Sequence, residues 1–120
     1  MSSIYVQIAS YRDPDLWNTV SDLIKNSSKK HKIDIAIVDQ YCEEDKDEDV
    51  VKNFNKLKVS SFCKLSYKKI HYTKTKGVCW VRHLLNLDYS KQDYTLQLDS
   101  HHRFVRNWDT VLIKMLKDLN

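Results

Sequence analysis

The sequence contains very little glycine and proline, with one residue of each in 120. Because Gly77 is the single glycine, the sequence excludes a Gly-rich phosphate loop and a G-x-G-x-x-G turn, which need several glycines close together. Long apolar runs are also missing: the longest, such as residues 35–38, are only a few residues, so we expect no transmembrane helix. The sequence begins with neither a basic segment nor a long apolar core, so we expect no secretory signal.

Cysteine is sparse as well. The three cysteines are an odd number at unrelated spacings, so they predict no disulfide framework, and a reducing, cytoplasmic compartment is the simplest location. A content of 42% hydrophobic and 30% charged residues excludes a disordered tail and is typical of a globular protein. The length predicts one domain over residues 1–120.

Charge is unevenly distributed along the chain, although the formal net charge is only +4. Residues 43–49 hold six acids, whereas residues 50–87 contain nine Lys and Arg and no acid. Two interpretations stay open: a solvated basic surface facing an acidic loop, or an electrostatic funnel for a polyanion such as a nucleotide diphosphate or nucleic acid. The cations do not share one helical face and no nucleic-acid-binding signature is present, so nucleic acid is the minority hypothesis.

Strand and helix patterns alternate along the whole chain. Strands are predicted at 4–9, 33–38, 65–72 and 94–99, and helices at 13–26, 50–57, 77–87 and 107–119. Asp13 is expected to cap the first helix, with Pro14 in its first turn. This alternation predicts an α/β fold with a mostly parallel sheet flanked by helices.

The periodicity also predicts which side chains are buried. We expect a core that includes Leu16, Trp17, Val20, Leu96, Leu98, Val111 and Leu112. The inward residues of the third helix are expected to be Trp80, Val81, Leu84, Leu85 and Leu87, and its outward ones Cys79, Arg82, His83 and Asn86. In the last helix we expect Val111, Leu112, Met115, Leu116 and Leu119 to face inward.

Polar residues follow the predicted strands at their carboxyl ends, where parallel α/β sheets bind ligands. Asp99 and His101 follow the fourth strand two residues apart, so both side chains could bind one cation, Mn²⁺ or Mg²⁺, together with phosphate oxygens. The alternative is that Asp99 caps the following turn and His101 is an exposed loop residue. Arg82 could contact a diphosphate or a base, or be an exposed helix arginine.

Four blocks in one order carry a family resemblance. They are IASYRDP at 8–14, GVCWVRH at 77–83, LQLDSHHRF at 96–104 and WD at 108–109. These blocks resemble the protein-hydroxyproline N-acetylglucosaminyltransferases, cytoplasmic enzymes of the GT-A type. The resemblance implies the Rossmann-like nucleotide-binding half of a GT-A fold, with strand order 3-2-1-4. It also implies transfer of GlcNAc from UDP-GlcNAc to a hydroxyproline of a ubiquitin-ligase adaptor, with retention at the anomeric carbon.

The resemblance also implies roles for individual residues. Asp99 and His101 correspond to the metal ligands of a D-S-H motif, and no residue of this sequence is evident as a catalytic nucleophile. Together with the strand-end positions, it suggests a donor-binding set of Ser10, Tyr11, Arg12, Asp39, Arg82 and Ser100.

The catalytic domain of that family continues past the last block, so we expect this chain to lack the acceptor-binding part. We would then expect weak binding of a uridine nucleotide and little or no transfer to a peptide. We would also expect self-association through the uncovered sheet edge beside the fourth strand and the inward face of helix 107–119. Two other hypotheses remain: a non-catalytic UDP-sugar-binding module, and a basic nucleic-acid-binding domain.

Overall fold

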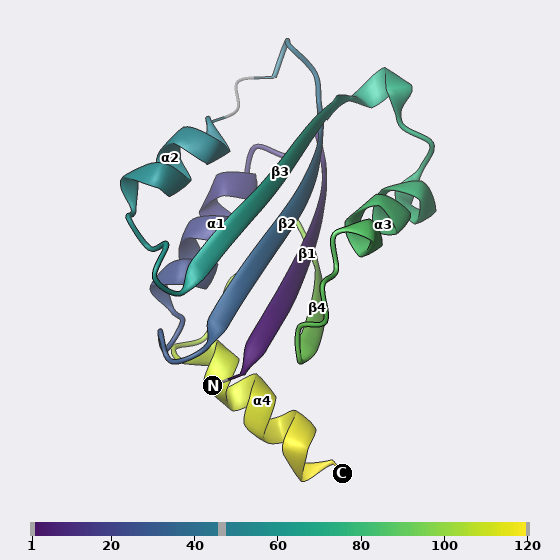
Figure 1. Ribbon diagram of the computed structural model, residues 1–120. Coiled ribbons are helices and arrows are strands. Elements are labelled where there is room, and N and C mark those ends of the chain that lie inside the picture. Colours follow the sequence, from purple (N-terminus) through teal and green to yellow (C-terminus); the bar gives the residue numbers. More distant parts are fainter. Residues whose placement is uncertain (1, 46–47, 120) are drawn as a thin grey trace.

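A single parallel sheet organises the protein in a computed structural model, which describes residues 2–45 and 48–119 (Figure 1). The elements are β1 (Ser3–Tyr11), α1 (Leu16–Lys25), β2 (Lys32–Tyr41), α2 (Val50–Lys56), β3 (Cys63–His71), the 3₁₀ turn η1 (Tyr72–Lys74), α3 (Val78–Leu87), β4 (Tyr94–Asp99) and α4 (Trp108–Asp118). The strand order is β3-β2-β1-β4 and every pair is parallel, which confirms the predicted α/β class and order. Residues 46 and 47 of the predicted acidic loop lie outside the described residues.

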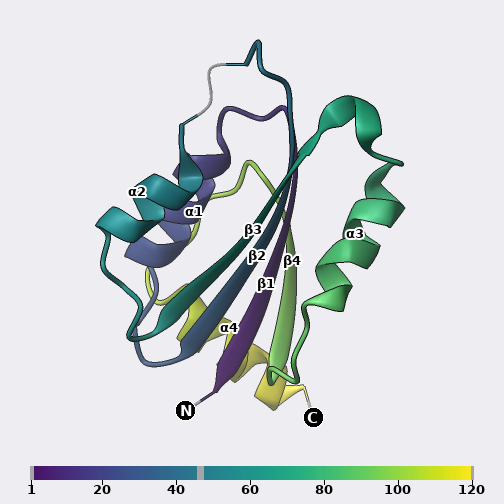
Figure 2. The ribbon, with the colours of Figure 1, turned by 45° about the horizontal axis from the view of Figure 1, so that its top comes forward.

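Helices cover both faces of this sheet, as Figure 2 shows, with α1 and α2 on one side and α3 on the other. The larger core cluster joins the sheet to α1, α2 and α4, and is rich in β-branched residues such as Ile4, Ile8 and Ile35. The smaller cluster, under α3, includes Tyr5 and Leu85. The two central strands, β1 and β2, are mostly buried on both faces, and their apolar runs at residues 4–6 and 35–38 fit this position.

Because all four strands are parallel, their carboxyl ends lie at the same end of the sheet, at the top of Figure 1. Ala9 of β1 pairs with Val38 of β2 and with Asp99 of β4. The turns that follow the strands therefore meet above this edge, where the sequence predicted a ligand site.

The first helix begins later than predicted. Its N-cap is Asp15, not Asp13, and Asp15 makes no side-chain capping bond. The Asp13 carboxylate instead accepts a hydrogen bond of 2.9 Å from the Asp15 backbone N–H. Residues 13–15 thus form a separate turn before the helix, because Asp13 and Asp15 both have partners on the loop after β4.

The predicted core is confirmed in part. Leu16, Val20 and Leu98 are buried, Trp17, Leu96 and Leu112 are partly buried, and Val111 is exposed. Exposed residues also include Leu87, Met115 and Leu119, which were predicted to face inward.

Helix α4 explains most of these differences. Its buried apolar residues are Trp108 and Ile113, and the Trp108 indole N–H donates to the Leu23 carbonyl at 2.8 Å. Figure 1 shows that the helix then runs past the lower end of the sheet, so its last turns have no sheet to pack against. An apolar stripe on α4 is therefore left exposed.

No helix among residues 2–45 and 48–119 is long and apolar enough to cross a membrane.

Candidate functional site

A hollow of about 550 Å³ lies at the carboxyl edge of the sheet, between the ends of β1 and β4 and the start of α3. Its lining comes from four segments of the chain: Ala9, Tyr11, Asp13, Gln40, Tyr72, Thr75, Gly77, Val78, Asp99, Ser100 and His101. Side chains that are distant in sequence therefore surround one space, as expected for a parallel sheet.

The two predicted metal ligands both line this hollow. Asp99 is the last residue of β4, and its side chain is 71% exposed on the face that carries α3. His101 is 69% exposed. Exposed carboxylate and imidazole groups at one site are free to meet a ligand from solvent.

Asp13 is a second carboxylate at this site, and its role there was missed in the sequence. It accepts a hydrogen bond of 2.6 Å from the Ser100 hydroxyl and lies 3.2 Å from Nδ1 of His101. Although burial alone would raise it, the pKa of Asp13 lies below its ordinary value, because Ser100, the Asp15 backbone and His101 hydrogen-bond to the carboxylate. Because Pro14 follows it, Asp13 was interpreted as a helix cap and not as a residue of the candidate site.

Arg82 of α3 faces the sheet, which corrects the prediction that it lies on the outward face. Its guanidinium donates to the backbone carbonyl of Leu98 at 3.2 Å and to that of Gln7 at 3.4 Å. It lies 3.9 Å from the Asp99 carboxylate. Asn86 also faces the sheet and accepts from Gln7 Nε2 at 2.7 Å. Arg82 is thus a half-buried cation behind Asp99.

Aromatic residues form another wall of the hollow. Tyr11 and Tyr72 both line it and meet edge to face, with ring centroids 6.2 Å apart. The Arg12 guanidinium lies 4.8 Å from the Tyr72 ring centroid and makes two bonds, of 2.9 and 3.1 Å, to the Asp45 carboxylate. This pairing raises the pKa of Arg12 and lowers that of Asp45. Arg12 therefore supports the aromatic wall and is already paired with an acid.

Two predicted donor-binding residues lie away from this hollow. Asp39 lies on the opposite face of the sheet, where it lines a second hollow and hydrogen-bonds with Tyr67. Ser10 is fully buried on the same face as Asp39, and its hydroxyl has no hydrogen-bond partner in the described part of the chain. Because side chains alternate across a strand, both point away from the neighbours that do line the first hollow, Gln40 and Tyr11.

The start of α3 completes the site. Gly77 has φ +93°, which lets the chain turn sharply into the helix, and a side chain there would be strained. Gly77 provides no side-chain cap, so the first N–H groups of this ten-residue helix have no capping side chain where the helix meets the hollow. Unsatisfied N–H groups and the helix dipole favour an anion at such an end.

A divalent cation suits the donor chemistry here, since carboxylate oxygens and an imidazole nitrogen bind Mn²⁺ or Mg²⁺. Within the described ranges, however, no three His, Cys, Asp or Glu side chains gather closely enough to hold a metal ion alone. The residues therefore fit a cation that takes its other ligands from a phosphate group or water.

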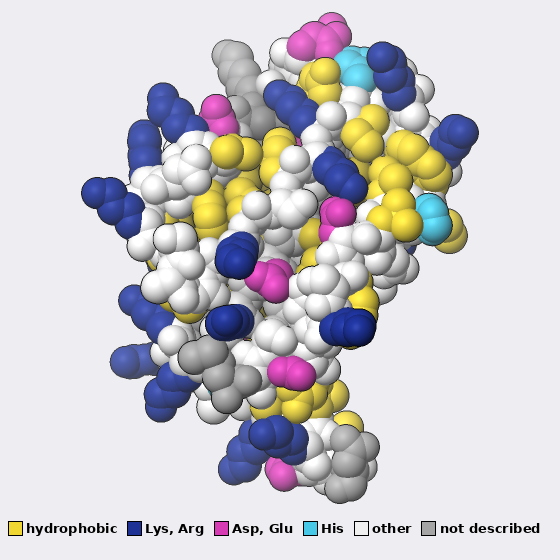
Figure 3. Space-filling model, in the orientation of Figure 1, with side chains coloured by type: hydrophobic (Ala, Val, Ile, Leu, Met, Phe, Trp, Pro, Cys, Tyr) yellow, Lys and Arg dark blue, Asp and Glu magenta, His cyan; other side chains and the backbone are white. Residues whose placement is uncertain are grey.

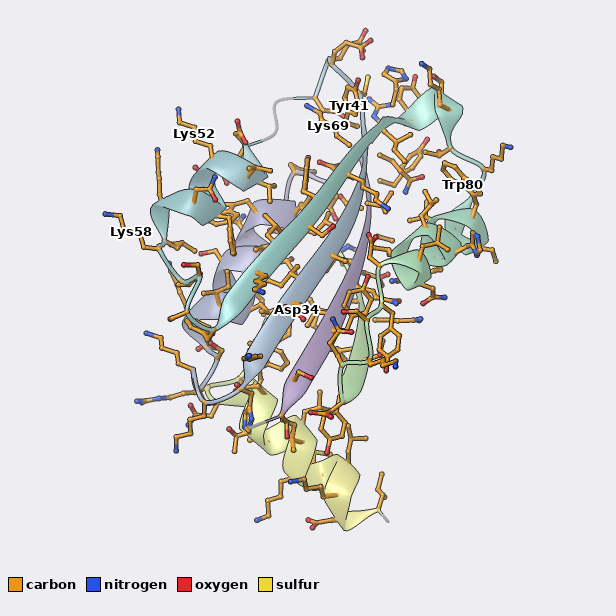
Figure 4. The ribbon with its side chains drawn as sticks, viewed as in Figure 1. Asp34, Tyr41, Lys52, Lys58, Lys69 and Trp80 are labelled. Carbon is orange, nitrogen blue, oxygen red and sulfur yellow. The ribbon has the colours of Figure 1, made fainter. Side chains whose placement is uncertain are left out.

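The basic residues predicted as one surface are spread over several elements. Figure 3 shows Lys and Arg side chains scattered over the face that carries α2 and β3. In Figure 4, Lys52 and Lys58 point away from the body of the protein, whereas Lys69 lies over the ring of Tyr41, 4.5 Å from its centroid. Lys68 pairs with Asp88 at 3.2 Å. This arrangement favours the solvated surface over a funnel, and lysines along the edge strand β3 also discourage strand pairing there.

The family comparison adds an independent finding. The sequence matches the family Glycosyltransferase (GlcNAc) over residues 3–61 and 45–120. The chain belongs to this family. Together the two matched stretches cover all the strands and helices described above. The candidate site of this glycosyltransferase-family member therefore lies within the matched region. No curated protein and no solved structure matches the chain.

Proposed function

We propose that this chain binds a UDP-sugar, UDP-GlcNAc above all, as the donor-binding part of a metal-dependent glycosyltransferase. The observation that carries the proposal is the hollow where Asp99, His101 and Asp13 lie opposite the start of α3. A nucleotide diphosphate has the matching chemistry, because it offers an aromatic base at one end and anionic oxygens in the middle.

Each part of the donor has a candidate partner in the hollow. The uracil ring would lie against Tyr11 and Tyr72, since aromatic side chains stack on the faces of bases. The diphosphate would accept from the N–H groups at the start of α3. Ser100 is occupied by Asp13, so we assign it to shaping the site instead of donor contact.

Asp99 and His101 would hold the cation, with diphosphate oxygens completing its ligands. When bound, Mn²⁺ or Mg²⁺ neutralises negative charge on the departing UDP. Arg82 adds a second positive charge close to Asp99. The protein itself orients the donor, and orientation supplies much of the rate enhancement in group transfer.

The acceptor in this proposal is a protein hydroxyl group, such as that of hydroxyproline, in a cytoplasmic protein. The support is the resemblance of the four sequence blocks, which extends beyond the family shown by the comparison. A non-catalytic UDP-sugar-binding module is the second candidate, because the residues named above all act on the donor side.

A panel of nucleotide sugars tests the proposal. The melting temperature of the chain is measured with UDP-GlcNAc, UDP-glucose, GDP-mannose and UDP, each with and without Mn²⁺. We expect stabilisation by uridine nucleotides that increases with Mn²⁺, and equal effects of GDP-mannose and UDP-GlcNAc would contradict the proposal. Hydrolysis of UDP-GlcNAc without acceptor, compared with its binding by calorimetry, separates the enzyme from the binding module.

A further inference from the structure

The Asp13 carboxylate is the point where three hydrogen-bond donors converge. One oxygen accepts from the Asp15 backbone N–H at 2.9 Å. The other accepts from the Ser100 hydroxyl at 2.6 Å and lies 3.2 Å from His101 Nδ1. Asp13 is only 19% exposed, whereas the His101 ring that it contacts is 69% exposed. A mostly buried carboxylate thus holds one nitrogen of an exposed imidazole.

We propose that Asp13 is a positioning residue that fixes the proton of His101 on Nδ1 and so presents Nε2 to a divalent cation. The inference rests on the proposed function, in which His101 binds the metal of a nucleotide complex. The reasoning starts from hydrogen-bond chemistry. An ionised carboxylate only accepts hydrogen bonds, so the imidazole nitrogen that faces it must be the donor. In the neutral ring the other nitrogen then carries the lone pair that a cation needs.

The ionised state of Asp13 has structural support. The Asp15 backbone N–H and the Ser100 hydroxyl both donate to this carboxylate, so its two other contacts also use it as an acceptor. The carboxylate also belongs to the turn between β1 and α1, so it anchors His101 to an element other than its own. Pairing of this kind sets the tautomer and the ring orientation of metal-binding histidines.

The turn after β4 has a separate anchor on α1, which makes the inference testable. The Thr19 hydroxyl donates to the Ser100 carbonyl at 2.7 Å and accepts from the His102 backbone N–H at 2.9 Å. Thr19 is fully buried. Substitution of Asp13 should therefore release the His101 ring while the backbone of the turn stays in place.

The first experiment measures the tautomer directly, with neither metal nor nucleotide present. Long-range ¹H–¹⁵N spectra of the chain report which ring nitrogen of His101 carries the proton. We expect the proton on Nδ1 in the unsubstituted chain and a mixture of tautomers in Asp13→Asn. Asp15→Asn is the matched control, because Asp15 lies in the same turn and pairs with Arg103 at 2.9 Å instead. An unchanged tautomer in Asp13→Asn would overturn the inference.

The second experiment measures Mn²⁺ affinity by electron paramagnetic resonance in the presence of UDP. Asp13→Asn should weaken binding about 10- to 100-fold, the usual effect of losing such a partner. In a His101→Ala background the same substitution should cause no further loss, because Asp13 acts through His101. An equal loss in both backgrounds would show that Asp13 binds the metal itself and would overturn the positioning role.

Failure of the unsubstituted chain to bind Mn²⁺ with UDP would count against the proposed function. The tautomer measurement would still test whether Asp13 fixes the proton of His101 on Nδ1, because it needs neither metal nor nucleotide. Urea unfolding of each variant checks that the fold is retained, and Asp13→Glu, which keeps a carboxylate, should restore part of the tautomer preference.

Discussion

Replacing Asp99 by alanine should remove the linkage between metal and nucleotide while leaving the fold intact. The side chain is 71% exposed, and its nearest charged neighbour, Arg82, is 3.9 Å away and anchored on two backbone carbonyls. Loss of an exposed side chain of this kind changes the free energy of unfolding by about 0.5 kcal/mol or less. The melting temperature of Asp99→Ala without ligand should therefore stay close to that of the parent chain.

The effect with ligand is larger and can be calculated. A ligand at ten times its Kd stabilises the folded state by about 1.4 kcal/mol. For a domain of this size, each kcal/mol raises the melting temperature by about 4 °C, so UDP with Mn²⁺ should add about 6 °C. In Asp99→Ala the increment that depends on Mn²⁺ should vanish. His101→Ala should reduce it less, because imidazole is a weaker ligand than carboxylate for a hard cation.

Differential scanning fluorimetry with UDP, in Mn²⁺ and in EDTA, measures both quantities. Asp93→Ala is the matched control, because it also removes one negative charge. Asp93 lies just before the amino end of β4, away from the candidate site, and its carboxylate accepts a hydrogen bond from the Ser3 backbone N–H. A full Mn²⁺-dependent increment in Asp99→Ala would refute the metal site and leave Asp99 as a residue of the turn.

Three further outcomes are expected. Leu85→Ala, which removes a fully buried side chain that holds α3 on the sheet, should lower the free energy of unfolding by about 2–5 kcal/mol in urea titrations and weaken UDP binding. Ellman's reagent should label Cys79 rapidly, because it is exposed, and Cys63 slowly, because burial raises its pKa to about 12; a fast phase that persists in Cys79→Ser would contradict this. The chain should self-associate through the apolar face of α4, so Met115→Lys should lower its mass by light scattering; a parent chain that is monomeric at every concentration would disprove it.

The sequence was sufficient to predict the sheet and its strand order, and it placed the candidate site at the carboxyl ends of the strands. Order and direction of the strands follow from the alternation of strand and helix patterns, together with the family resemblance. The alternation does not tell which face of a buried strand a polar residue occupies. Residues 33–38 are mostly buried on both faces of the sheet, so no alternation of polar and apolar residues indicates which face Asp39 occupies. In the structure Asp39 lies on one face of the sheet and Asp99 on the other.

Local signals failed at Asp13 because a tertiary interaction prevails over them. An aspartate followed by proline is a strong helix-start pattern, and its side chain could have bonded to the first turn of α1. The Ser100 hydroxyl and the His101 ring, about 90 residues later, bind this carboxylate instead. Only the pairing of β1 with β4 brings these groups together, and no local window of sequence contains that information.

Arg82 shows why polarity alone mispredicts the direction of a side chain near the end of a sheet. Val81 and Leu85 fix the buried stripe of α3, and Arg82, three residues before Leu85, lies at the border of this stripe. Its aliphatic stem can therefore cover the sheet while its guanidinium reaches further. A charge-based rule assigns it to solvent. Yet the carbonyls of Gln7 and Leu98 attract a donor from the helix above, and guanidinium has five donors in a fixed geometry. Held on these carbonyls, Arg82 cannot turn away from Asp99, so a positive charge is present at the site before any ligand binds. Binding of an anionic ligand would therefore need no rearrangement of this cation, and a site prepared in this way costs less free energy to occupy.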